Sequence, residues 1–401
     1  MNDRAIAQNV SELVLGTYAL PYKKLAKHLT DKQIKQLINA RPNNDEFSVL
    51  SGIVYWHGEE LSSMKLACLT TGVKCVPDIK LQNSCGKLVH DLHAEVLSIR
   101  SFSWYIMEEI EKLENQEASD LVEFDNLGKY RLKSDIRIAL YISEVPCGDC
   151  SLEELSQLDP VPWKEGPESS NALRGRSSYT QVGKVRTKPG RMDSPISLSK
   201  SCGDKLTTVS MKGLLKGIVA DLINNSHVLL DYIILPAEKA QKNSASLERC
   251  FNERIDFTAV EFYHRFKILN CSDDIVAKYN KLLEANKSGT LGIDREKKKR
   301  ACDLSLVCIP ESKVIEVIND GVKNGNSIKT VLKNGRGYSI LCRYSMFQKR
   351  IQLDKSCNTY KSYLDWKKRA SNAEYTEKVL RAKKSLGTWG DSTFDDFTLG
   401  V

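Results

Sequence analysis

Two short motifs carry residue types that can hold and use a metal ion. The first is His-Ala-Glu at residues 93–95, and the second is Pro-Cys-Gly-Asp-Cys at residues 146–150. A catalytic zinc ion takes three protein ligands, such as neutral imidazole and thiolates, and leaves a fourth position for water. A carboxylate two residues after the histidine can lie beside the metal without binding it and accept a proton from water. The motifs therefore predict a zinc site built on His93 and Cys147, with Glu95 as the proton shuttle.

Each motif has an ordinary alternative when it stands alone. A single histidine at a helix start is more often structural than a ligand, and Cys-x-x-Cys also occurs as a redox pair or as half of a structural zinc site. Both motifs together, in this order, match the H-x-E and P-C-x-x-C signature of zinc-dependent nucleobase deaminases. The combination favours a deaminase-type metal site over either alternative.

The elements that must position these residues alternate between strands and helices. Apolar runs at 47–56 and 64–76 predict a strand pair, and 93–113 has the spacing of an amphipathic helix about five turns long. Period-two alternation predicts a strand over 136–142, and the run 227–236 predicts another buried strand. This alternation predicts a layered α/β core with helices on both faces of a central mixed sheet.

Local signals also place the ends of some elements. Ser151 with Glu154 forms a capping-box pattern, so we expect a new helix directly after the cysteine motif, and its positive N-terminus would favour the Cys147 thiolate. The glycine-rich stretches 288–300 and 321–337 are predicted to be exposed loops. Because no internal repeat or long low-complexity linker is present, we expect one domain over residues 1–401.

Charge is distributed unevenly along the chain. The 401 residues carry a formal net charge of +8, and residues 343–384 alone contain twelve Lys or Arg against four Asp or Glu. A second stretch, 174–191, contains six cations and no acid. Such segments suit a polyanion, because phosphate contacts supply most of the affinity of non-specific nucleic-acid binding. Solvated surface lysines are the ordinary alternative for either stretch.

The cysteines and the apolar runs indicate in which cellular compartment the protein is expected. Twelve scattered cysteines without a secretory leader predict reduced thiols rather than a disulfide framework, and so a cytoplasmic or nuclear protein. No apolar run approaches the roughly 20 residues that a membrane-spanning helix needs. We therefore expect no membrane association.

Three segments resemble the conserved blocks of a known enzyme family. The segments HDLHAEVLSIRS, LYISEVPCGDC and SKSCGDKL are similar to those of the adenosine deaminases that act on RNA, and the resemblance runs from about residue 47 to LGTW at 386–389. It implies hydrolytic conversion of adenosine to inosine on a cytidine-deaminase-like core. The core motifs would lie at about 47–240, followed by a basic, helical C-terminal extension at about 241–401.

The identity of the third zinc ligand differs between the literal motif and the resemblance. The literal P-C-x-x-C motif would use Cys150. The family resemblance implies instead a cysteine in a distant Ser-Cys-x-Asp-Lys block, which is Cys202 here. We expect Cys202, with Cys150 as the alternative.

The resemblance also implies a substrate. Fewer than fifty residues precede the first predicted strand, so we expect no double-stranded-RNA-binding domain there, and the chain most resembles the tRNA-specific members. Their substrate is the adenosine 3′ of the anticodon (position 37) of eukaryotic alanine tRNA. Alternatives are a deaminase of another RNA or of cytidine, and a non-catalytic RNA-binding subunit, which the presence of Glu95 disfavours. The expected RNA contacts are Arg174, Arg176, Lys184 and Arg186.

A second cofactor is implied by the same resemblance. Members of this family bury an inositol hexakisphosphate beneath the active site, and a polyphosphate needs many cations that are otherwise costly to bury. The matching positions in this chain are Arg100, Lys205, Tyr360, Lys361, Lys367, Lys368, Tyr375 and Trp389.

Overall fold

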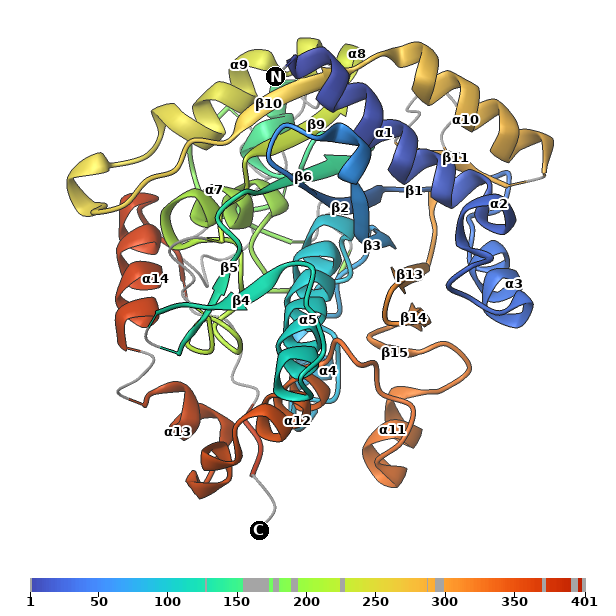
Figure 1. Cartoon of the computed structure of the whole chain (residues 1–401). Helices are drawn as coiled ribbons and strands as arrows, with labels where there is room; N and C mark the ends of the chain where they lie inside the picture. The colour runs from blue at the N-terminus through green and yellow to red at the C-terminus, as the bar shows by residue number, and fades with distance from the viewer. Residues whose placement is uncertain are drawn as a thin grey trace.

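An eight-stranded mixed sheet forms the centre of the protein, seen here in a computed structural model that describes residues 2–126, 128–153, 173–175, 180–188, 194–223, 228–286, 288–292, 299–369, 373–390 and 396–398 (Figure 1). Its strand order is β10-β9-β6-β2-β3-β13-β14-β15. The β6–β9 and β9–β10 pairs are parallel, and the remaining neighbours are antiparallel. The strands are β2 (Leu50–His57), β3 (Lys65–Thr71), β6 (Ile136–Ile142), β9 (Tyr232–Pro236), β10 (Lys267–Cys271), β13 (Leu304–Ile309), β14 (Val314–Asn319) and β15 (Val322–Lys323).

Among the described residues, three smaller sheets lie outside the central one. Their strands are β1 (Glu46–Ser48) with β11 (Thr290–Leu291) and β12 (Arg300–Ala301), β4 (Val122–Phe124) with β5 (Tyr130–Leu132), and β7 (Leu173–Arg174) with β8 (Arg186–Thr187). The longer helices are α1 (Asp3–Ala19), α3 (Asp31–Asn39), α5 (Ala94–Glu114), α7 (Cys202–Lys212), α10 (Asp273–Ala285), α12 (Arg343–Leu353) and α14 (Ala373–Ser385). The shorter ones are α2 (Pro21–Leu25), α4 (Asp78–Leu81), α8 (Ala237–Lys242), α9 (Ser244–Glu248), α11 (Ile328–Asn334) and α13 (Tyr363–Lys367).

Helices cover both faces of the central sheet because its strands alternate their apolar side chains between two cores. In β2, Ile53 and Tyr55 pack with residues of α5, α7 and α12, whereas Val54 and Trp56 pack with residues of α1, α3 and α10. This period-two alternation is what a sheet buried on both sides requires. The predicted α/β architecture is confirmed, and no helix among the described residues is long and apolar enough to cross a membrane.

The C-terminal half differs from the expected helical extension. Residues 241–401 supply β10, β13, β14 and β15 as well as helices, so half of the strands of the central sheet come from this region. The predicted loop at 321–337 contains α11, because Ser327 caps its N-terminus and Gly335, in the left-handed region at φ 64°, ends it. The short strand β11 lies within the predicted loop at 288–300, and β12 begins at the last residue of that loop.

Candidate metal centre

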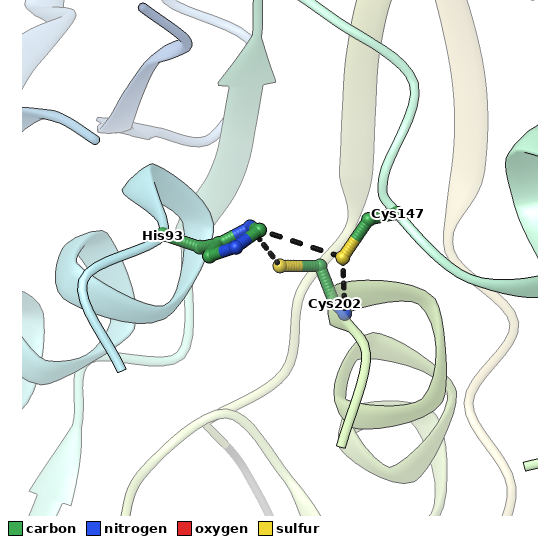
Figure 2. Close-up of side chains that lie close together, drawn as sticks. All are labelled: His93, Cys147 and Cys202. Carbon is green, nitrogen blue, oxygen red and sulfur yellow. Dashed lines mark hydrogen bonds between the residues drawn. The ribbon is translucent and has the colours of Figure 1, made fainter. Parts of the chain in front are cut away.

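The three expected ligands His93, Cys147 and Cys202 come together from three separate segments (Figure 2). His93 precedes the first residue of α5, Cys147 lies in the loop after β6, and Cys202 begins α7. The Nδ1 atom of His93 lies 3.8 Å from the Cys147 sulfur and 3.5 Å from the Cys202 sulfur. One ligand atom from each residue lies within 4.8 Å of the others, which is the spacing that three ligands around one tetrahedral ion require.

Backbone geometry brings the Cys147 loop against the start of α7. Gly148 has a φ of 102°, and a Cβ atom there would lie 2.2 Å from the Ser201 hydroxyl oxygen, so only glycine fits this close approach. The Cys202 amide donates to the Cys147 sulfur at 3.3 Å. The N-terminus of α7 therefore faces Cys147. After Cys147 the structure has a 3₁₀ turn over Asp149–Ser151 that continues into helical residues at 152 and 153, and the rest of the expected helix, with Glu154, lies outside the described residues.

Cys150 lies apart from the metal-ligand cluster. Its buried sulfur packs beside that of Cys250, and a Cβ atom at Gly203 would lie 3.0 Å from the former and 3.1 Å from the latter. Burial raises the pKa of Cys150 well above its ordinary value, and the neighbouring Cys250 adds to this rise. The pKa of Cys147 is held well below its ordinary value by a hydrogen bond from Cys202 and by the charge of His93. The geometry groups Cys202, not Cys150, with the other two ligands.

Glu95 lies beside this cluster. It is the second residue of α5 and is almost fully buried, and its Oε2 atom has no hydrogen-bond partner among the described residues. Burial raises the pKa of Glu95, and the nearby Cys147 sulfur adds to the rise against the charge of His93. A buried carboxylate oxygen without a protein partner is suited to accept a proton from a water molecule.

Comparison with known proteins decides the family. Residues 68–392 match the model of the adenosine-deaminase (editase) domain. The chain belongs to this family. It is 30% identical to the tRNA-specific adenosine deaminase 1 of Schizosaccharomyces pombe, over 93% of each chain, and 28% identical to that of Saccharomyces cerevisiae, over 88% of this chain and 86% of the relative. The double-stranded RNA-specific editase Adar of Drosophila melanogaster is 24% identical over 48% of this chain and 30% of its own. As a member of the editase family, the protein is an adenosine deaminase.

A buried charge network adjoins the cluster of His93, Cys147 and Cys202, and the sequence analysis missed two members of this network, Asp91 and Lys188. Lys188 is 3% exposed, and its Nζ atom lies 2.7 Å from both carboxylate oxygens of Asp91 and 3.4 Å from the Cys202 sulfur. Although burial alone would raise the pKa of Asp91, Lys188 and Lys205 hold it well below its ordinary value. In the sequence, Lys188 is only one of six cations in the basic stretch 174–191. Asp91 lies next to the His-Ala-Glu motif, but no sequence pattern indicates its ion-pair partner.

Lys205, expected to bind the polyphosphate, points its ammonium group into this network. It donates to Asp91 and, at 2.7 Å, to the Ser199 hydroxyl. The negatively charged carboxylate of Asp91 and the hydroxyl of Ser199 together provide the Lys205 ammonium with a counter-charge and hydrogen-bond acceptors within the protein.

A separate basic cavity of about 320 Å³ contains three of the residues expected to bind a polyphosphate. Arg100, Lys367 and Tyr375 line it, and the sequence analysis missed the further lining cations Lys216, Arg343 and Lys383. Trp389 does not line it, but its ring lies 6.0 Å from the ammonium of the lining residue Lys383. Tyr360, Lys361 and Lys368 do not line it, and the last two are exposed.

The electrostatics of this cavity fit an anionic ligand. Burial lowers the pKa of Lys216 well below its ordinary value, and the charges of Lys212, Lys205 and Arg100 lower it further. The side chain of Lys367 is exposed overall, yet desolvation of its ammonium group and the charge of Arg343 lower its pKa. Cations this close together favour a bound polyanion, because its charge would restore their protonated forms.

The four expected RNA contacts have different environments. Lys184 is exposed, whereas Arg174 is half-buried and donates to the Ser194 carbonyl. Arg186 is wholly buried, and its guanidinium donates to the carbonyls of Gly175 and Gln181, so it has no surface with which to contact RNA. Arg176 lies outside the described residues.

Proposed function

We propose that this chain is a zinc-dependent deaminase that converts adenosine 37, directly 3′ of the anticodon of eukaryotic alanine tRNA, to inosine. The observation that carries the proposal is the cluster of His93, Cys147 and Cys202 with the buried, unpartnered Glu95 oxygen beside it. Support for the tRNA substrate comes from the two yeast relatives, which are named tRNA-specific adenosine deaminase 1 and match most of this chain. The tRNA species and the position rest on the family resemblance.

The chemistry assigned to the protein's own residues is proton transfer. A zinc ion held by the cluster would supply Lewis acidity that lowers the pKa of water towards about 7. Glu95 takes one proton from the attacking water at its free Oε2 atom and passes it to the purine ring, and then takes the second proton from the new C6 hydroxyl and passes it to the departing ammonia. Water adds to C6 of adenine, the C–N bond breaks, and inosine and ammonia are the products.

Base access favours a loop nucleotide as the substrate. Because C6 is shielded within a stacked helix, the adenosine must be flipped out of the stack, and a loop nucleotide costs less to extract than a paired one. Contacts to the rest of the RNA would offset that cost. We therefore expect intact alanine tRNA to react faster than its isolated anticodon stem-loop, and free adenosine to be a poor substrate.

The proposal is tested by incubating the purified protein with total tRNA and sequencing for adenosine-to-inosine changes. Glu95→Gln, which keeps the shape of the side chain but not its basicity, is the matched control, with zinc content measured for both proteins. We expect inosine at position 37 of alanine tRNA only with the unmodified protein, and about one zinc per chain in each. Deamination of cytidine or free adenosine, or equal silence of both proteins on tRNA, would refute the proposal.

We also propose that the basic cavity binds inositol hexakisphosphate and that the protein works in the cytoplasm or nucleus. The cavity proposal is supported by its lining of Arg100, Lys216, Arg343, Lys367 and Lys383. The compartment proposal is supported by the twelve cysteines, which are all free thiols. Protein denatured after extensive dialysis should release an inositol polyphosphate detectable by mass spectrometry, and folded, active protein without one would contradict the cavity proposal.

A further inference from the structure

Five exposed lysines lie close together in sequence near the N-terminus. Lys23 and Lys24 belong to α2, Lys27 follows it, and Lys32 and Lys35 belong to α3. We call these five residues the N-terminal lysine surface. The only acidic residue between positions 21 and 39 is Asp31. Figure 1 shows α2 and α3 at the right-hand edge of the molecule.

The ammonium groups of this surface are not compensated within the described protein. None of the five has an ion-pair or hydrogen-bond partner among the residues that the structure describes. Lys32 and Lys35 are three residues apart on one helix, a spacing at which like charges repel and destabilise the helix by a few tenths of a kcal/mol. A polyanion bound between these lysines would attract both ammonium groups and offset their mutual repulsion.

About half of the cations of the C-terminal basic segment, residues 343–384, pair within the protein or line the basic cavity, while Lys355, Lys361, Lys368 and Lys384 are exposed. Arg350 and Arg369 are buried and both pair with Asp221. Lys349 pairs with Glu111. Arg343, Lys367 and Lys383 line the basic cavity. The excess charge of this segment therefore leaves fewer cations for an outer surface than its composition suggests.

We propose that the N-terminal lysine surface binds backbone phosphates of the tRNA outside the anticodon loop. The inference rests on the proposed function. Lysine is a compact charge suited to phosphate contacts that position an RNA without reading its sequence. The surface lies before residue 68, where the match to the editase family begins, and none of its lysines belongs to the metal site or the basic cavity.

The chain path connects this surface with the metal site. From α3 the chain passes into β1 and then β2, where the Leu50 amide donates to the Ser143 hydroxyl and the Ser143 amide donates to the Leu50 carbonyl. Ser143 is four residues before Cys147. Because α2 and α3 pack on the face of the sheet opposite α5 and α7, a folded tRNA held there would have to extend around the molecule to reach the segment that carries Cys147.

The test compares two triple variants of the full chain with the same change in net charge. One carries Lys23→Glu, Lys24→Glu and Lys27→Glu, and the control carries Lys129→Glu, Lys281→Glu and Lys333→Glu at exposed, dispersed positions. The dissociation constant for folded alanine tRNA is measured against salt concentration, and single-turnover deamination is measured at saturating tRNA. A Lys→Gln version of each triple is used should charge reversal impair folding, which circular dichroism reports.

We expect the surface variant to bind tRNA on the order of tenfold to a hundredfold more weakly, and the slope of log affinity against log salt to fall by about 2 to 3. Its rate at saturation should match that of the unmodified protein, and the control should bind almost normally. Equal weakening in both triples, or unchanged binding in the surface triple, overturns the inference. So does loss of binding to phosphatidylserine vesicles with tRNA binding intact, which would assign the surface to membranes. If lysine-dependent tRNA binding occurs without any deamination, the proposed function fails while this surface stands.

Discussion

Replacing Asp91 with asparagine should strongly destabilise the protein while preserving the shape of the side chain. Asp91 is 6% exposed, and its two oxygens lie 2.7 Å from the ammonium of Lys188, which is 3% exposed. Lys205 donates to the same carboxylate. The neutral amide of Asp91→Asn would leave two buried or half-buried ammonium groups without their counter-charge, and breaking a buried ion pair in this way costs about 3–5 kcal/mol.

A double-mutant cycle separates the ion pair from general disruption of the site. Asp91→Asn, Lys188→Met and the double variant are unfolded in urea, and zinc content is measured in each preparation. Because Lys188→Met removes the charge that asparagine would leave unpaired, the double variant should be less destabilised than the sum of the single variants, by at least about 1 kcal/mol. Additive losses, or a cost below about 1 kcal/mol for Asp91→Asn, would refute the assignment of this network.

Three further results are expected. Cys202→Ala should lose zinc whereas Cys150→Ala should retain about one zinc per chain by metal analysis, because Cys150 packs against Cys250 rather than His93; the reverse pattern would exchange the third ligand. Lys216→Met should lower the amount of inositol polyphosphate released on denaturation, because it removes a buried cation of the cavity, whereas Lys361→Met, at an exposed position outside the cavity, should not. Burial alone would lower the pKa of His90, but hydrogen bonds to Asp78 and Cys75 raise this pKa to about 9. The stabilisation of the folded state by charged His90 is therefore complete below pH about 6.5 and is lost as the pH rises towards 9. The unfolding free energies of the unmodified protein and of His90→Gln should converge between these pH values. Curves that stay parallel would contradict this expectation.

Residues with a local signature were predictable from the sequence. His93 and Glu95 begin an amphipathic helix, and Cys147 follows an alternating strand, so periodicity alone placed them at the ends of α5 and β6. Cys202 is identified only by its resemblance to the Ser-Cys-x-Asp-Lys block of the family. No local sequence pattern indicates that α7 approaches the Cys147 loop. That approach depends on Gly148, whose φ of 102° lets the backbone pass the Ser201 side chain.

Counting charges along the sequence identified the segments that are rich in cations, but not whether each cationic side chain points into the core or towards solvent. Arg186 belongs to a stretch with six cations and no acid, yet it is wholly buried and donates to backbone carbonyls. Arg350 and Arg369 belong to the most basic segment of the chain, yet they are buried with Asp221, more than a hundred residues away in sequence. Composition cannot distinguish an arginine that binds solvent or RNA from one that closes the core, because the distinction depends on an acid or a carbonyl supplied by a distant element.

The metal cluster and the basic cavity are linked through Lys205. Its charge is among those that lower the pKa of Lys216 in the cavity wall, and its ammonium donates to Asp91. Asp91 in turn accepts from Lys188, whose ammonium lies 3.4 Å from the Cys202 sulfur. In a buried setting such charges interact strongly because little water screens them. An anion in the cavity would stabilise the protonated form of Lys216 and offset its repulsion of Lys205, so the cavity and the cluster of His93, Cys147 and Cys202 form one electrostatic unit rather than two independent sites.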